Sequence, residues 1–251
     1  MADFDFPLDP WDRYALIGKT GCGKTSFATM LCCSMIPVHY GEWECHWLDT
    51  KGDPADIKRL LEWQFIHVDD WRRDVPRKYQ RWNRIYWPIR EKPEATVVEQ
   101  SQTVIGRLLA RSQMRGRRGH SNVLIVIDEY VHVVLGPRNP GRNLHDAFKT
   151  GRGRRLGIIG CTQEPVYVPR QLMSQAGHAF LFDLHLADDI KKVQGWHEGY
   201  ERPTLLGDKH GVWHSYLDDN HPWRYYSGQR AWYDLHVAPR EAKVAALQEG
   251  A

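Results

Sequence analysis

The chain lacks several features that would assign it quickly to a class. No apolar run is long enough to span a bilayer, and we expect neither a membrane segment nor a signal peptide at the acidic start, residues 1–5. The five cysteines show no metal-ligand spacing and read as reduced thiols in a cytosolic setting. No internal repeat or low-complexity tract is visible. These absences argue against a membrane span, a disulfide framework and a structural metal site.

The chain also has little excess of positive over negative charge, because the formal net charge is only +3 over 251 residues. Its distribution is uneven. Residues 107–155 hold eleven Lys and Arg against three acidic residues, a local net charge of +8, whereas residues 183–251 carry −3. A basic middle and an acidic tail suit a polyanion-handling face on a self-associating protein, and solvated helix faces are the alternative.

A glycine-rich segment is the most informative stretch that is present. Residues 18–25 read GKTGCGKT and fit the Walker A pattern G-x-x-x-x-G-K-[ST], between an apolar run at 14–17 and a segment that can open a helix. A strand, a glycine loop and a helix N-terminus form a phosphate site, so we expect ATP there. Lys24 would reach the β- and γ-phosphates and the Thr25 hydroxyl would bind Mg²⁺. A glycine loop that only caps a helix is the alternative. The predicted nucleotide-binding residues are Gly18, Lys19, Thr20, Gly21, Cys22, Gly23, Lys24, Thr25 and Ser26.

Short apolar runs alternate with helical periodicity along most of the chain, which predicts an α/β fold with a mostly parallel, doubly wound sheet. Residues 1–12 predict an extended N-terminal arm, 13–197 the core, and 198–251 a C-terminal appendage with a β-hairpin (212–217 and 223–226) and a short helix (239–248). Strands are expected at 14–17, 44–48, 65–68, 85–89, 123–127, 157–161 and 179–183, and helices at 55–63, 94–113 and 144–150.

Two carboxylates follow the apolar run 123–127. Asp128 at the end of this strand would hold Mg²⁺, and Glu129 could polarise an attacking water. Small-molecule kinases generally lack such a second carboxylate. The pair therefore favours an enzyme that hydrolyses a nucleoside triphosphate.

Polar residues flank the next predicted strand at both ends. Gln163 follows it and would sense the γ-phosphate or position water, since neighbouring parallel strands end at one sheet edge. Arg154, and secondarily Arg152, precede it. In a ring they would face a neighbouring subunit's nucleotide and stabilise transition-state charge; in a monomer they are merely a basic turn.

Four separated segments together resemble the FtsK–HerA superfamily of P-loop DNA-pumping ATPases. They are 18–25, 48–53 (LDTKGD), 126–129 (VIDE) and 153–163, the last continuing toward 188–190, and the likeness spans roughly residues 14–193. The resemblance implies a RecA-like core and a ring, usually hexameric, through which double-stranded DNA passes without sequence preference. Arg115, Arg117 and Arg118 are candidate DNA contacts, with a solvated basic loop as the alternative.

Within that superfamily, a compact chain without a membrane segment is similar to the genome-packaging ATPases of tailless, membrane-containing viruses with double-jelly-roll capsids. This implies host-cytoplasmic or virion-associated localisation and partners at a capsid vertex or membrane. Three alternatives are open: another FtsK–HerA or Zot-like assembly ATPase, a P-loop kinase of a small molecule, and an assembly protein that nucleotide only gates.

Overall fold

A single sheet of eight strands organises the chain in the computed structural model, which describes residues 10–36, 43–72, 83–89, 96–113, 122–195 and 223–227. The strand order is β3-β4-β2-β5-β6-β1-β7-β8, parallel throughout except that β8 pairs antiparallel with β7. The strands are β1 (Arg13–Ile17), β2 (Trp43–Asp49), β3 (Ile66–His67), β4 (Arg84–Pro88), β5 (Asn122–Ile127), β6 (Leu156–Thr162), β7 (His178–Phe182) and β8 (Trp223–Ser227).

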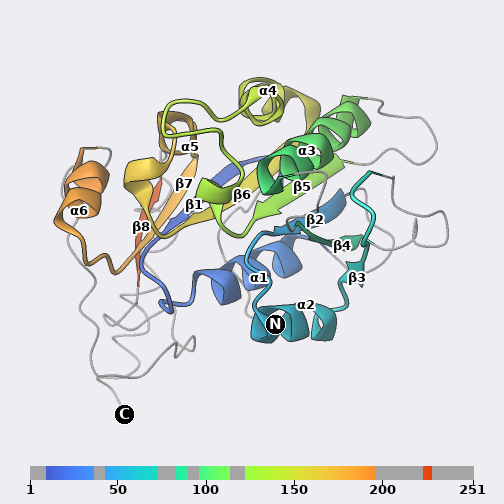
Figure 1. Cartoon of the computed structure of the whole chain (residues 1–251), viewed down its shortest axis with the longest axis horizontal. Coiled ribbons are helices and arrows are strands. Elements are labelled where there is room, and N and C mark those ends of the chain that lie inside the picture. The colour runs from blue at the N-terminus through green and yellow to red at the C-terminus, as the bar shows by residue number, and fades with distance from the viewer. Residues whose placement is uncertain are drawn as a thin grey trace, which may run out of the picture.

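Helices cover both faces of the sheet (Figure 1). The first face packs against α3, α4 and α5, and the second against α1 and α2. The helices are α1 (Lys24–Met35), α2 (Pro54–Glu62), α3 (Val97–Gln113), α4 (Arg142–Thr150), α5 (Arg170–Ser174) and α6 (Ala187–Gln194), with short 3-10 turns η2 (Tyr130–His132), η3 (Arg152–Arg154) and η4 (Pro165–Tyr167).

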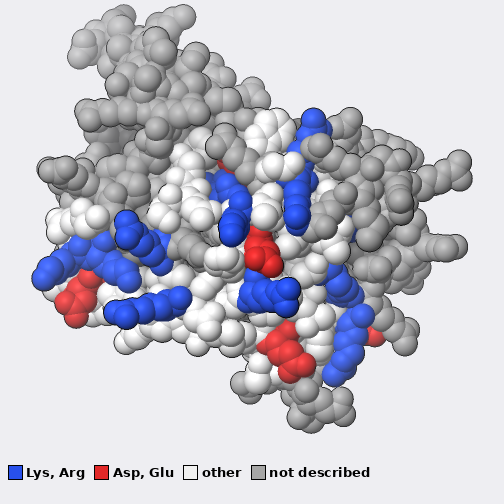
Figure 2. Space-filling model, turned by 90° about the horizontal axis from the view of Figure 1, so that it is seen from above, with Lys and Arg blue, Asp and Glu red and all other residues white. Residues whose placement is uncertain are grey.

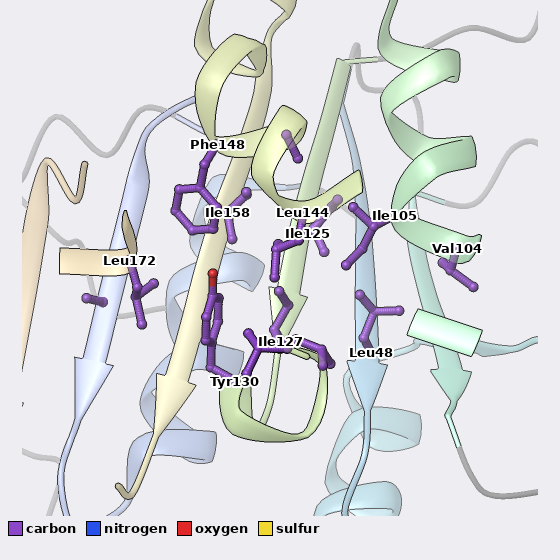
Figure 3. Packing of buried hydrophobic residues seen from close by; sticks show 14 of the residues in the cluster. Leu48, Val104, Ile105, Ile125, Ile127, Tyr130, Leu144, Phe148, Ile158 and Leu172 are labelled. Atoms are coloured by element: carbon purple, nitrogen blue, oxygen red, sulfur yellow. The ribbon is translucent and has the colours of Figure 1, made fainter. Parts of the chain in front are cut away.

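The central strands are buried along their whole length, because helices lie on both sides of them. Every residue of β5 and β6 is buried; for β5, the continuous apolar run 123–127 predicts this. On the α3 and α4 face, Ile125 and Ile158 pack with Leu144 and Phe148 (Figure 3). The polar residues at the carboxyl ends of β5 and β6 are therefore attached to the buried centre of the sheet.

The position of β6 matters most for function, because it separates β1 from β5. Ile17 is paired with Thr162, and Ile127 with Gly160, so the three strands end almost level. The chain leaves these strands into the glycine loop, Asp128–Glu129 and Gln163. Strand order thus brings three distant segments to one sheet edge.

A buried polar network connects α3 to the neighbouring strands β2 and β4. Arg111 donates to both carboxylate oxygens of Glu44 at 2.8 and 2.7 Å. Trp87 Nε1 donates to His46 Nδ1 at 3.0 Å, so His46 Nε2 carries the hydrogen that faces Glu44 at 3.2 Å. Burial lowers the pKa of His46, which favours the neutral ring.

The predicted α/β class with a mostly parallel sheet is confirmed. Neither α5 nor α6 was predicted as a helix. Residues 223–227 form a strand, but they join the edge of the main sheet through β7. The predictions for 1–9, 212–217 and 239–248 lie outside the described residues, and the division of the chain at 12 and 197 stays a prediction.

On its α4 side, the surface of the described part is mixed in charge. Figure 2, which looks onto the α4 side, shows lysines and arginines dispersed with acidic side chains among them. Arg115, Arg117 and Arg118 lie outside the described residues, so the most basic part of the sequence adds nothing to this view. Within the described ranges, no helix has the length and apolar character needed to cross a membrane.

Candidate functional site at the carboxyl edge of the sheet

The glycine loop between β1 and α1 has a backbone that suits phosphate. Gly21 and Gly23 have φ of 74° and 92°, in the left-handed region where glycine is favoured. Gly18 has no room for a side chain, because a Cβ there would lie 2.4 Å from Phe182 Cβ. Gly23 caps α1 and offers no side chain to its first N–H groups. These groups remain available to an anion at the helix N-terminus.

Lys24 is folded onto its own loop. Its ammonium donates to the carbonyl oxygens of Gly18 and Lys19, both at 2.7 Å, and the residue is 4% exposed. The loop is held from outside as well: Lys19 pairs with Asp183 at 2.8 Å, and Gly18 N–H donates to Thr162 O at 3.1 Å. The predicted phosphate ligand is therefore already enclosed by the loop that would hold the phosphates.

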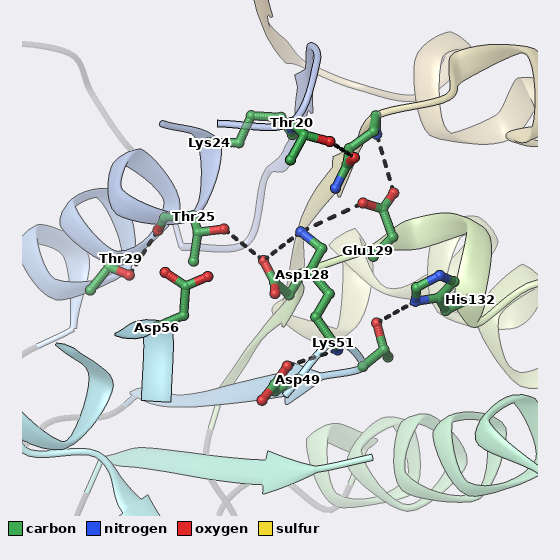
Figure 4. Close-up of polar contacts among 12 residues, drawn as sticks. Thr20, Lys24, Thr25, Thr29, Asp49, Lys51, Asp56, Asp128, Glu129 and His132 are labelled. Atoms are coloured by element: carbon green, nitrogen blue, oxygen red, sulfur yellow. Dashed lines mark hydrogen bonds and ion pairs between the residues drawn. The ribbon is translucent and has the colours of Figure 1, made fainter. Parts of the chain in front are cut away.

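Thr25 and Asp128 meet across the sheet edge (Figure 4). The Thr25 hydroxyl donates to Asp128 Oδ1 at 3.0 Å. A hydroxyl and a carboxylate are oxygen ligands that Mg²⁺ accepts, and Mg²⁺ commonly takes its other ligands from substrate phosphates and water. The two residues predicted to hold Mg²⁺ thus form a donor set of the right chemistry.

Asp128 is almost wholly buried, and this sets its acidity. Burial raises the pKa of Asp128 to about 6; nearby Asp49 and Asp56 add to the rise, while Lys51 and the Thr25 hydroxyl oppose it. The carboxylate is therefore ionised at neutral pH, at a cost that a cation would offset.

Glu129 points back toward the end of β6. Its Oε1 accepts the backbone N–H of Gln163 at 3.2 Å, and the residue is 3% exposed. The Gln163 side chain faces the glycine loop and accepts a hydrogen bond from the Thr20 hydroxyl. The structure thus places Glu129 and Gln163 beside each other and beside the loop, as strand order predicts.

Lys51 has no predicted role, although it lies within residues 48–53, which carry part of the resemblance. Lys51 follows β2, the strand next to β5, and its Nζ lies 3.5 Å from both Asp128 Oδ1 and Glu129 Oε2. Burial lowers its pKa, but the two carboxylates outweigh burial and raise it overall. The ion pairs follow from strand order, which no local pattern encodes.

The two arginines predicted to act at a nucleotide lie far from this loop. Arg152 and Arg154 form η3 at the amino end of β6, and Gln163 follows its carboxyl end. The strand has seven residues, and its six steps of about 3.3 Å separate the two ends by about 20 Å. The structure therefore does not bring Arg152 or Arg154 to their own chain's loop.

Taken together, the edge offers the groups that hydrolysis of a phosphoanhydride requires. They are a backbone cradle with an ammonium for phosphates, a hydroxyl–carboxylate pair for Mg²⁺, and a second carboxylate beside an amide to orient water. Ser26, the last predicted loop residue, lies in the first turn of α1. The residues present therefore fit Mg²⁺-nucleotide.

Comparison with known proteins rests on structure. No protein-family model matches the chain, and a search of curated proteins gives no significant match. Among solved structures, the genome-packaging NTPase B204 from Sulfolobus turreted icosahedral virus 2 superposes with a TM-score of 0.52 and 12% identity, over 74% of this chain and 82% of that chain, in its complexes with AMP and with ATP-γS. Its complex with sulfate gives a TM-score of 0.52 and 12% identity over 76% and 82%.

At 12% identity, the superposition establishes the fold and leaves the activity open. The predicted fold is thus confirmed: this chain has a RecA-like α/β fold, similar to that of the genome-packaging NTPase B204.

Proposed function

We propose that the chain is an ATP-hydrolysing motor of the FtsK–HerA superfamily that moves double-stranded DNA and packages a viral genome. The observation that carries the ATPase part is the meeting of Lys24, Thr25, Asp128, Glu129 and Gln163 at one sheet edge. The fold shared with a viral genome-packaging NTPase supports the packaging part. The same proposal places the chain in the host cytoplasm or on the virion, with partners at a capsid vertex or membrane.

Each polar residue has a task in hydrolysis that its position allows. Lys24 would turn from the loop carbonyls to the β- and γ-phosphates, and Thr25 with Asp128 would hold Mg²⁺. The bound ion supplies positive charge that offsets the charge on the phosphates. Glu129, fixed by the Gln163 N–H, would accept a hydrogen bond from the attacking water and orient it. The Gln163 amide, which faces Thr20, would contact the γ-phosphate or the water.

A ring is part of the proposal, and the location of η3 supports it. Arg154 and Arg152 lie about 20 Å from the chain's own Gln163, at the other end of β6. They contribute to hydrolysis only if they reach the nucleotide of a neighbouring copy. A head-to-tail arrangement that closes, such as a hexamer, gives every copy such a neighbour.

DNA contact is assigned to the basic residues that follow α3. Arg115, Arg117 and Arg118 would bind phosphates of the duplex without reading its sequence. Each neutralised phosphate releases counterions, so affinity should fall steeply with salt. The ATPase core would span residues 13–197, with the arm 1–12 and the appendage 198–251 available for assembly.

The test is phosphate release with and without duplex DNA, measured across a salt series, alongside the mass of the protein in solution. We expect DNA to stimulate turnover, the stimulation to fade as salt rises, and active fractions to be oligomeric. Robust hydrolysis that ignores DNA would overturn the motor. A phosphorylated acceptor in place of free phosphate would identify a kinase.

Two variants separate a motor from a protein that nucleotide only gates. Glu129→Gln should retain ATP while turnover falls about 100-fold or more, since general base catalysis contributes on this order. Glu164→Gln is the matched control, because Glu164 is exposed and lies next to Gln163. If Glu129→Gln leaves DNA movement intact, hydrolysis does not drive it.

The ring predicts complementation between subunits. Arg154→Ala lacks the arginine offered to a neighbour, and Lys24→Ala lacks its own phosphate ligand. Mixing the two should give more activity than either variant alone, because mixed rings contain some interfaces with both groups intact. Absence of any gain, in mixtures shown to co-assemble, would remove Arg154 from the mechanism.

A further inference from the structure

Lys51 has no task in the proposed hydrolysis, yet it lies inside the site. Its side chain is 22% exposed and reaches between the two carboxylates that follow β5 (Figure 4). Its Nζ is equally distant, at 3.5 Å, from Asp128 Oδ1 and Glu129 Oε2. One ammonium is thus shared by the predicted Mg²⁺ ligand and the predicted base.

The turn that carries Lys51 is fixed by buried groups. Asp49, which is 3% exposed, accepts the backbone N–H groups of Lys51 at 2.9 Å and Gly52 at 2.8 Å. Its other oxygen accepts the Tyr86 hydroxyl of β4 at 2.7 Å. Gly52 has φ of 71°, so the chain turns where glycine is favoured. Buried Asp49 therefore fixes the backbone of Lys51, and this fixes the direction in which the Lys51 side chain leaves the turn.

Glu129 is held unevenly at its two oxygens. Oε1 accepts the Gln163 N–H, while Oε2 is buried and makes no hydrogen bond to the described residues. The group that faces Oε2 is the Lys51 ammonium, close enough for an ion pair but long for a hydrogen bond. Lys51 and Gln163 thus lie on opposite sides of the carboxylate and define its orientation.

We propose that Lys51 is a positioning residue that acts through Glu129: its ammonium holds the carboxylate against the end of β6 and competes with Mg²⁺ at Asp128. The inference rests on the proposed ATPase function. Two consequences of opposite sign follow when the charge is removed. Turnover falls because Glu129 loses its orientation, whereas Mg²⁺ binds at lower concentration because a competing cation is gone.

The experiment uses the full chain with Lys51→Met, which keeps the length of the side chain but not its charge. Lys51→Arg keeps the charge. Lys58→Met is the matched control, because the Lys58 side chain is 80% exposed and pairs only loosely, at 3.9 Å, with Glu62. Thermal unfolding of each variant checks that it folds.

For Lys51→Met we expect kcat to fall about 10- to 100-fold, with KM for ATP changed less than about threefold, as for loss of an interaction made only in the transition state. In binding titrations with a fluorescent ATP analogue, the Mg²⁺ concentration giving half-maximal binding should fall about threefold or more, since a charge near the metal ligands is removed. Lys51→Arg should recover most of the turnover, and Lys58→Met should match the wild type.

The Glu129→Gln background tests whether Lys51 acts through Glu129. If Lys51 acts through Glu129, adding Lys51→Met to Glu129→Gln should cause little further loss in single-turnover rate, because the two effects are not independent. A further loss as large as that in the wild-type background would overturn the inference. So would an unchanged kcat, or an Mg²⁺ requirement that stays the same or rises. Absence of phosphate release from the wild type would instead refute the ATPase proposal, while the Mg²⁺ titration would still decide the competition at Asp128.

Discussion

The Thr25 hydroxyl donates a 3.0 Å hydrogen bond to Asp128, across 103 positions of the sequence. The two residues lie in different elements: Thr25 in the first turn of α1, and Asp128 directly after β5. They meet because β1 and β5 flank β6 and end at the same edge.

Removal of the Thr25 hydroxyl should weaken Mg²⁺-dependent nucleotide binding. For Thr25→Ala we expect at least about a tenfold loss of affinity in the presence of Mg²⁺, about 1.4 kcal/mol, and little change without it. Thr25→Ser keeps the hydroxyl and should bind nearly as the wild type does. Calorimetric titration with and without Mg²⁺ measures both; an equal loss in both conditions would contradict a metal role.

A methyl group at Gly18 should disturb the loop and the fold. The added Cβ would lie 2.4 Å from Phe182 Cβ, and the two must move apart. Overpacking of this kind costs about 1–3 kcal/mol, so Gly18→Ala should lower the melting temperature and nucleotide affinity together. Gly153→Ala is the control, since nothing lies within 4 Å of its Cβ position. Equal melting temperatures for the two variants would disprove the crowding.

The buried Asp128 should make stability fall as pH rises. Its pKa in the folded chain is about 6, above the ordinary value of 3.8, so between these values the folded state keeps a proton that the unfolded state has released. Asp128→Asn has no such proton and still offers an oxygen to Thr25. Its unfolding free energy relative to wild type should therefore be higher at pH 7.5 than at pH 5, by about 1 kcal/mol. Denaturant titrations at the two pH values measure this difference, and an unchanged difference would show that Asp128 is not so perturbed.

The network around Glu44 should respond more strongly to one substitution than to two. Arg111→Met leaves a buried carboxylate without its bidentate partner, which typically costs about 3–5 kcal/mol. Adding Glu44→Gln removes the unpaired charge, so the double variant should recover part of the loss. Unfolding free energies from denaturant titration compare the two. A double variant less stable than Arg111→Met would contradict this account.

Much of the fold follows from local patterns in the sequence. The strand β5 is predicted because 123–127 is uninterruptedly apolar, and the loop 18–23 because its glycines and Lys24 have fixed spacing. The sequence does not predict helix α6, because 187–194 is short and mostly polar, with only Asp189 and Val193 buried. Short elements of this kind are fixed by tertiary contact: the Val166 N–H donates to Asp189, and Lys192 donates to the Val166 carbonyl.

The side-chain partners are less predictable than the elements. The sequence predicts Asp128, Glu129 and Gln163 at one edge, because Asp128–Glu129 and Gln163 each come after an apolar strand. Lys51 also follows a strand, but its direction depends on the clamp by Asp49 and on β2 lying beside β5. Strand order is a global property, so the ion pairs of Lys51 become visible only in three dimensions.

The burial of β6 has a mechanical consequence for the proposed ring. The strand is hydrogen-bonded on both sides, to β1 and β5, and all seven of its residues are buried. A strand that is paired on both sides and buried is held firmly within the sheet; Gln163 follows one of its ends and Arg154 precedes the other. In the proposed ring, a displacement of Gln163 by the γ-phosphate would be transmitted through β6 to Arg154, which faces the nucleotide of the neighbouring subunit. Strand β6 would then couple the nucleotide state of one subunit to hydrolysis in the next, and so set the order in which the subunits hydrolyse ATP.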